Sequence, residues 1–198
     1  MTDELFFRVV FSTFWIFFFA IFGWLAHSVK WSAGRRTTPR ERRLRVAALV
    51  FAALYFAGAL LYALVPSWVM FVSIALVDWF RLVMLGLALL GFSFLMWALR
   101  ALGRNWAPSL SGVRRGTFLV TTGPYGIVRH PIYLGVFIFL AAVALLSANL
   151  LIILPTVALL ILLYAQLPDE ESMLIDQFGD EYREYMKRTP RFIPRLRV

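Results

Sequence analysis

Five long apolar runs constrain the fold of this chain more than any other feature of its sequence. A helix needs about 20 predominantly apolar residues to cross the hydrocarbon core of a bilayer. Because 61% of the 198 residues are hydrophobic and only 16% are charged, a large soluble domain is excluded. We therefore expect an all-α integral membrane protein that forms a single membrane domain over residues 1–198. Its predicted transmembrane helices are residues 5–26, 46–65, 79–102, 131–147 and 149–167.

The short connections between these runs predict how they are joined. The sequence Ser147-Ala148-Asn149 separates the last two runs and carries no charge, so the two helices should form a tight C-terminal hairpin. Pro131 suits the first turn of a helix and is expected to begin the fourth span. Residues 67–77 are apolar but too short to span, which predicts an interfacial or re-entrant segment.

The distribution of Lys and Arg predicts the orientation in the membrane. Seven of these residues lie in 27–45, five in 100–129 and six after residue 167, whereas 66–78 and the hairpin turn hold none. With five spans, the three basic segments fall on one side, which the positive-inside rule assigns to the cytoplasm. We expect an N-terminus outside and a C-terminus in the cytoplasm, in a membrane of the bacterial inner-membrane type.

The net charge of +9 could also indicate a nucleic-acid partner. The basic residues lie in loops between apolar runs, however, where they set topology and contact anionic membrane lipids. We therefore expect membrane lipids and no nucleic acid as partners. With no Cys and only two His, a metal site made by the protein alone is not expected either.

One polar stretch, GPYGIVRHPIYLGV at residues 123–136, stands at the start of the fourth run. Arg129 and His130 lie at the positive end of the predicted helix, which favours anionic groups of a ligand. Tyr125 and Tyr133 offer aromatic faces, which attract cations such as a sulfonium. An alternative stays open at this point, because Arg and Tyr also anchor helix ends at membrane interfaces without any ligand.

The predicted cytoplasmic tail, residues 168–198, differs in character from the rest of the chain. Its apolar and aromatic residues recur at helical spacing, which predicts an amphipathic helix that contributes to the site, although Gly179 weakens its middle. Pro190 and Pro194 should end that helix. Glu170 and Glu171 lie at its start, next to the hairpin, where a carboxylate can hold ammonium or hydroxyl groups. They could equally be a solvated helix start.

Four segments together resemble the isoprenylcysteine carboxyl methyltransferase family of integral membrane enzymes, a group that includes phospholipid methyltransferases. The segments are LVTTGPY at 119–125, RHPIYLG at 129–135, Glu170-Glu171, and FGDEYREY at 178–185. The resemblance covers roughly the C-terminal two fifths of the chain and is specific in order and spacing. A core of five spans with a hairpin of the fourth and fifth is what the family implies.

The resemblance implies S-adenosylmethionine as the cofactor, bound on the cytoplasmic side. It implies that Leu119 and Val120 line the nucleoside region and that Glu170 holds the amino-acid end. The remaining expected cofactor-binding residues all belong to the polar stretch at the start of the fourth span. They are Tyr125, Arg129, His130, Pro131 and Tyr133.

The acceptor stays open because of Gln166, the expected substrate-binding residue. Family members that methylate a prenylcysteine carboxylate carry an Arg at this position, and a neutral amide cannot supply its charge. A prenylcysteine-like carboxylate, a lipid amine or a thiol are the alternatives. We assign no catalytic residue, since methyl transfer by in-line displacement depends mostly on orientation and exclusion of water. An NADPH-dependent membrane reductase of related fold and a non-catalytic membrane protein are the rival interpretations.

Overall fold

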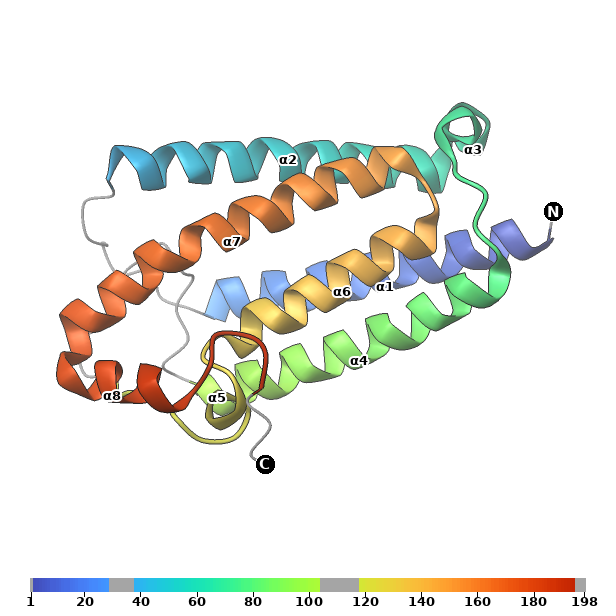
Figure 1. Cartoon of the computed structure of the whole chain (residues 1–198). Helices are drawn as coiled ribbons and strands as arrows, with labels where there is room; N and C mark the ends of the chain where they lie inside the picture. Colours follow the sequence, from blue (N-terminus) through green and yellow to red (C-terminus); the bar gives the residue numbers. More distant parts are fainter. Residues whose placement is uncertain (1, 29–37, 104–117, 195–198) are drawn as a thin grey trace.

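The computed structural model describes residues 2–28, 38–103 and 118–194, and every regular element in these ranges is a helix (Figure 1). The long helices are α1 (Thr2–Ser28), α2 (Pro39–Leu64), α4 (Asp78–Leu102), α6 (Pro131–Ser147) and α7 (Leu150–Phe178). The short ones are α3 (Pro66–Val69), the 3₁₀ turn η1 (Met70–Val72), α5 (Pro124–Ile127) and α8 (Asp180–Arg188). The predicted all-α architecture is confirmed for this part of the chain.

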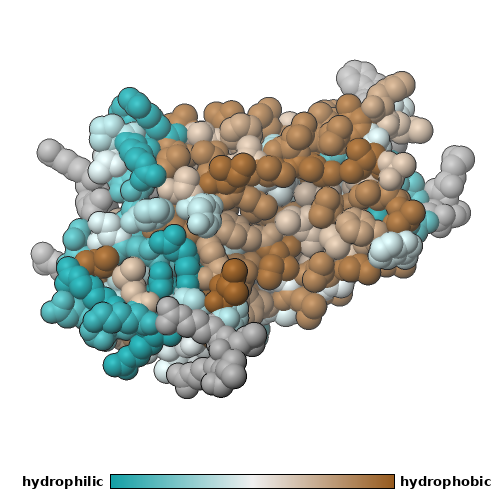
Figure 2. All heavy atoms as spheres, viewed as in Figure 1, coloured by the Kyte–Doolittle hydropathy of each residue, from teal (hydrophilic) through white to brown (hydrophobic). Residues whose placement is uncertain are grey.

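Among the described residues, three helices are long and apolar enough to cross a membrane, namely α2, α4 and α7. The hairpin helix α6 is apolar but has only 17 residues, and α1 encloses the first predicted span in one helix of 27 residues. Figure 2 shows apolar residues over the body of the bundle and hydrophilic residues at one end. The chain is therefore an integral membrane protein, while the number of five spans stays a prediction.

Local sequence signals explain where α2 and α6 begin. The helix α2 begins seven residues before the predicted span because Thr38 and Glu41 form a capping box. The Glu41 amide donates to Thr38 Oγ1 at 3.2 Å, and the Thr38 amide donates to Glu41 Oε2 at 2.7 Å. The helix α6 begins at Pro131, as the sequence predicted. The basic segments 29–37 and 104–117 lie outside the described residues.

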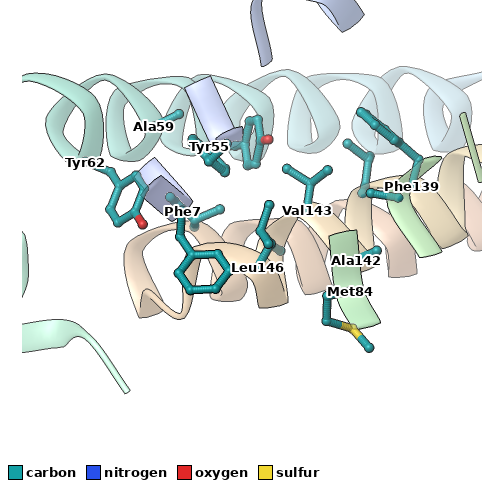
Figure 3. Packing of buried hydrophobic residues seen from close by; sticks show 14 of the residues in the cluster. Phe7, Tyr55, Ala59, Tyr62, Met84, Phe139, Ala142, Val143 and Leu146 are labelled. Carbon is teal, nitrogen blue, oxygen red and sulfur yellow. The ribbon is translucent and has the colours of Figure 1, made fainter. Parts of the chain in front are cut away.

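Small residues bring the helices close enough to share one core. A Cβ at Gly135 of α6 would lie 2.8 Å from Leu95 Cα of α4, and a Cβ at Gly91 of α4 would lie 2.8 Å from the Phe139 amide nitrogen. The two glycines thus allow close contact of α4 and α6 from both sides. Figure 3 shows the buried side chains that fill the interior between α1, α2, α4 and α6, among them Phe7, Tyr62 and Phe139.

The hairpin turn between α6 and α7 confirms the predicted tight connection. Ala148 adopts a left-handed conformation with φ 51° and ψ 34°, and Asn149 caps α7 by accepting from the Leu151 amide at 3.0 Å. The Asn149 side-chain amide also donates to the Val69 carbonyl at 2.9 Å and to Ser73 Oγ at 3.1 Å. The turn therefore holds the connection 66–77, which forms α3, η1 and an extended stretch at this end of the bundle.

Arg81 ties three helices together near the same turn. Its Nε donates to the Leu146 carbonyl at the end of α6 at 2.9 Å, and its Nη1 donates to Glu4 Oε2 of α1 at 2.7 Å. The guanidinium also lies 3.8 Å from the centroid of the Phe7 ring. A cation paired with a carboxylate, a helix C-terminus and an aromatic face is well placed in apolar surroundings.

Replacing Arg81 with alanine is expected to lower the free energy of unfolding by about 2 to 3 kcal/mol. The change removes the side-chain donor to the Leu146 carbonyl and the ion pair of Glu4, which keeps only the hydrogen bond from the Tyr62 hydroxyl at 3.1 Å among the contacts described. The midpoint of thermal unfolding in detergent measures this effect. Arg100→Ala is the matched control, since Arg100 lies exposed on the same helix. Equal midpoints for the two variants would contradict the structural role of Arg81.

The tail departs from the single amphipathic helix that the sequence predicted. The helix α7 continues past residue 167 to Phe178, so the fifth predicted span and the tail share one helix. Gly179 then adopts φ 59° and ψ −128°, a positive-φ conformation that favours glycine and ends α7 before α8 begins. The chain leaves α8 after Arg188, shortly before Pro190, and returns toward the start of α6 (Figure 1).

Candidate functional site

Three segments that are distant in sequence meet at the hydrophilic end of the bundle (Figures 1 and 2). They are α5 with the start of α6, the end of α7 with α8, and the C-terminal segment 189–194. The Arg129 amide donates to the Pro190 carbonyl at 2.8 Å, and the His130 amide donates to the Arg191 carbonyl at 3.4 Å. These two backbone hydrogen bonds hold the C-terminal segment against the polar stretch 123–136, which contains most of the expected cofactor-binding residues.

The Glu171 carboxylate is the centre of this assembly. Its side chain is only 6% exposed, and Oε1 accepts from Arg129 Nη2 at 3.0 Å and from Arg129 Nε at 3.2 Å. His130 Nε2 lies 3.1 Å from the same oxygen, and Arg191 Nε donates to it at 3.2 Å. Arg191 Nη2 pairs with the other oxygen, Oε2. One carboxylate thus joins the start of α6, α7 and the C-terminal segment.

Opposing influences act on the Glu171 carboxyl group. Burial raises its pKa, but the hydrogen bonds from His130, Arg191 and Arg129 outweigh burial and hold the pKa well below the ordinary value. Glu171 is therefore ionised and engaged by the protein itself. Arg129 is engaged as well, since it also donates to the Met186 carbonyl at 3.1 Å and the Thr189 carbonyl at 2.6 Å.

Glu170, the neighbouring residue, has a different environment. Tyr133 Oη donates to Glu170 Oε2 at 2.5 Å, and among the described residues Glu170 makes no ion pair. Burial raises the pKa of the Glu170 carboxyl, while nearby His130 and the Tyr133 hydrogen bond lower it less strongly. A partly buried carboxylate held by one neutral donor is a suitable partner for the cationic group of a ligand.

Aromatic rings pack next to Tyr133, the donor to this carboxylate. The His130 and Tyr133 rings meet edge to face with centroids 5.7 Å apart, and Tyr133 stands 6.1 Å from Phe137. Phe192 of the C-terminal segment lies 6.3 Å from His130 and 5.5 Å from Phe137, again between ring centroids. Tyr125 is buried in α5, and burial, then nearby Tyr185 and Glu170, raise the pKa of its hydroxyl.

The other predicted residues lie on the same elements or next to them. Pro131 is buried in the first turn of α6. Gln166 is buried on α7, one helical turn before Glu170. Leu119 and Val120 are half-buried in the extended segment that leads to α5. The structure brings Tyr125, His130 and Glu170 into one electrostatic environment, while the assignment of each residue to a cofactor stays a prediction.

Several residues of the assembly were missed or undervalued in the sequence. The sequence offers Glu170 and Glu171 alike as carboxylates for a ligand and does not reveal that Glu171 pairs with two arginines. It does not predict the return of Arg191 and Phe192 to the start of α6 either. The prolines at 190 and 194 were read as helix stops, although they also mark an extended stretch that can pair along another segment.

Residues 84–176 match the model of the isoprenylcysteine carboxyl methyltransferase family. This match confirms the resemblance found in the sequence. It extends from α4 to the end of α7 and includes the motif around His130 as well as Gln166, Glu170 and Glu171. The helix α8 and the C-terminal segment lie beyond the matched residues.

Curated relatives match parts of the chain. The chain is 31% identical over 109 residues to the nickel-cobalt-cadmium resistance protein NccN of Alcaligenes xylosoxydans xylosoxydans. The aligned residues make up 55% of this chain and 51% of that protein. The chain is also 44% identical over 71 residues to methanethiol S-methyltransferase 1 of Bradyrhizobium diazoefficiens. Here the aligned residues make up 35% of this chain and 24% of that protein. The chain thus spans about half or less of the length of these relatives.

A solved structure shares the fold. The eukaryotic intramembrane Ras methyltransferase ICMT superimposes with a TM-score of 0.53 at 24% sequence identity, over 81% of this chain and 54% of that one. At this identity the likeness shows the fold alone. It extends well beyond residues 84–176 and therefore includes helices of the N-terminal half.

Proposed function

We propose that this chain is an integral membrane methyltransferase that uses S-adenosylmethionine and acts on a lipophilic acceptor at the cytoplasmic face of the membrane. The observation that carries the proposal is the environment of Glu170, a partly buried carboxylate with a tyrosine donor and no ion pair among the described residues. It lies within the residues that match the family model.

The residues at this place fit the chemistry of such a donor. Glu170 suits the ammonium of the amino-acid end, and the rings of Tyr125 and Tyr133 suit the cationic sulfonium. Leu119 and Val120 are assigned to the nucleoside, and His130 and Pro131 to the rim of the site. When bound, S-adenosylmethionine supplies an electrophilic methyl group on a positively charged sulfur.

The chain's own contribution is orientation and the exclusion of water. Arg129 makes four hydrogen bonds within the protein, to Glu171 and to two carbonyls, so we assign it a positioning role at the rim. Phe192 packs near His130, Phe137 and Tyr164, with its ring centroid 6.2 Å from that of Tyr164 on α7. This apolar layer between α6 and α7 supports an approach of the acceptor from the lipid.

For the acceptor we propose a chemical class and not a specific molecule. Gln166 is buried and neutral, which leaves a prenylcysteine-like carboxylate, a lipid amine and a thiol as candidates. The proposal includes no metal ion and no nucleic acid. The hydrophilic end in Figure 2 contains α8 and the basic start of α2, which supports the orientation with this end and the C-terminus in the cytoplasm.

Calorimetric titration of the detergent-purified protein tests the cofactor. We expect binding of S-adenosylhomocysteine and no binding of NADPH, because one carboxylate without an ion pair suits a zwitterion better than a dinucleotide phosphate. Binding of NADPH alone would overturn the proposal in favour of a membrane reductase. Binding of neither ligand by a folded protein would also contradict it.

A further inference from the structure

The hydroxyl of Tyr182 is buried without a hydrogen-bond partner among the described residues. The residue is 1% exposed and lies on α8, among the apolar and aromatic residues of the tail that recur at helical spacing. An unpaired buried polar group costs about 1 to 3 kcal/mol, so nearly all buried hydroxyl groups in folded proteins find a partner. Packing of the Tyr182 ring does not explain why its hydroxyl is buried without a partner.

Tyr185, one turn later, shows what a purely structural tyrosine does here. Its ring lies 5.8 Å from the ring of Tyr182, and its hydroxyl donates to the Tyr125 carbonyl at 2.6 Å. The two tyrosines share the same face of α8, yet only the Tyr185 hydroxyl has a hydrogen-bond partner among the residues that the structure describes. They therefore form a matched pair for experiment.

The surroundings of the Tyr182 hydroxyl belong to the candidate site. Burial raises its pKa most, Glu171 and Glu170 raise it further, and Arg129 lowers it. The hydroxyl is therefore a neutral donor within electrostatic reach of the carboxylate assigned to the ligand ammonium. Two guanidinium groups, of Arg129 and Arg191, face the single carboxylate of Glu171 in the same place. A second anionic group can be accommodated there.

We propose that the Tyr182 hydroxyl donates a hydrogen bond to the carboxylate of the amino-acid end of the methyl donor. This inference rests on the proposed function and adds a binding residue to it. In an amino acid, the ammonium and the carboxylate are attached to the same carbon atom. A ligand whose ammonium pairs with Glu170 must therefore place its carboxylate within a few ångströms of that pair. The unpaired donor on α8 lies within electrostatic reach of Glu170 and is free to serve as the partner of that carboxylate, and it lies outside the segment that matches the family model.

Tyr182→Phe and Tyr185→Phe test the proposal with two ligands and one stability measurement. We expect Tyr182→Phe to bind S-adenosylhomocysteine about tenfold more weakly, as expected for a lost hydrogen bond to a charged group. Its affinity for 5′-methylthioadenosine, which lacks the amino-acid end, should not change. Its thermal unfolding midpoint without ligand should not fall, whereas that of Tyr185→Phe should, because only the second variant loses a bond within the protein.

Each other outcome has a defined meaning. Wild-type affinity for S-adenosylhomocysteine in Tyr182→Phe would overturn the proposal and leave the methyl-donor site intact. Equal weakening for both ligands would overturn it as well, since the effect would not be specific to the carboxylate. A lower unfolding midpoint would show that the hydroxyl has a partner within the protein. Failure of the wild-type protein to bind either ligand would overturn both this inference and the proposed function.

Discussion

Replacing Glu171 with alanine is expected to lower the free energy of unfolding by about 3 to 5 kcal/mol, the range for removal of one partner from a buried ion pair. The change leaves the guanidinium groups of Arg129 and Arg191 beside each other without their shared acceptor. It also removes a side chain that joins α7 to both the start of α6 and the C-terminal segment. Thermal unfolding in detergent measures the loss, and hydrogen exchange at residues 189–192 should rise at the same time.

Two controls separate this effect from a general sensitivity of the protein. Glu184→Ala removes a carboxylate whose ion pair with Lys187 lies on the exposed face of α8, and it should leave the midpoint unchanged. Glu171→Gln keeps the shape of the side chain and should fall between wild type and Glu171→Ala. A midpoint for Glu171→Ala equal to that of Glu184→Ala would show that the Glu171 cluster does not stabilise the fold.

The same cluster predicts a pH dependence of stability. Because the folded protein holds the pKa of Glu171 below the ordinary value of 4.5, its contribution is present above that pH and is lost as pH falls below it. The difference in unfolding midpoint between wild type and Glu171→Gln should therefore shrink between pH 5 and the acid limit of the protein. Glu170 has a raised pKa and acts in the opposite sense, but it is common to both proteins and cancels to first order. A difference that stays constant down to pH 3 would contradict the assignment.

Glu170→Gln is expected to have the largest effect on ligand binding. Loss of a charge-assisted contact to the ligand ammonium corresponds to about 10- to 100-fold weaker binding of S-adenosylhomocysteine. Stability should not fall, since the amide oxygen can still accept from Tyr133 and no desolvated charge remains. Calorimetric affinity and the unfolding midpoint, measured on the same sample, separate the two effects. The expected pattern is the reverse of that for Glu171→Ala, which damages the fold first.

Tyr133→Phe is the matched control for this variant. It removes the donor to Glu170 and leaves the carboxylate, so we expect a smaller loss of affinity than for Glu170→Gln. If Glu170→Gln keeps both wild-type affinity and wild-type stability, the cationic group of the ligand does not bind at Glu170, and the assignment is wrong.

The hairpin and the all-α architecture could be predicted because they depend on local signals. The length of an apolar run, a proline in a first turn and a short uncharged turn act within a few residues. Pro131 and the turn at Ala148 lie where the sequence placed them. The capping box at Thr38 is a local signal too, but it extends a helix beyond its apolar part, and hydropathy alone does not detect it.

The parts of the site that were not predicted depend on long-range pairing. Adjacent residues on a helix point in different directions, so which of Glu170 and Glu171 pairs with arginine is decided by what packs on each side. Arg191 and Phe192 reach the start of α6 only because Gly179 breaks the helix and the chain turns back after α8. The unpaired hydroxyl of Tyr182 follows from the same packing and has no signature in the sequence.

Transfer of a labelled methyl group tests the central claim most directly. The wild-type protein in lipid vesicles would be incubated with methyl-labelled S-adenosylmethionine and, separately, with a prenylcysteine, a lipid amine and an alkyl thiol. We predict label in the organic extract with at least one acceptor and a strong reduction with Glu170→Gln, while Glu184→Ala behaves as wild type. A folded wild-type protein that binds S-adenosylhomocysteine but transfers no label to any acceptor class would contradict the assignment as a methyltransferase of lipophilic substrates.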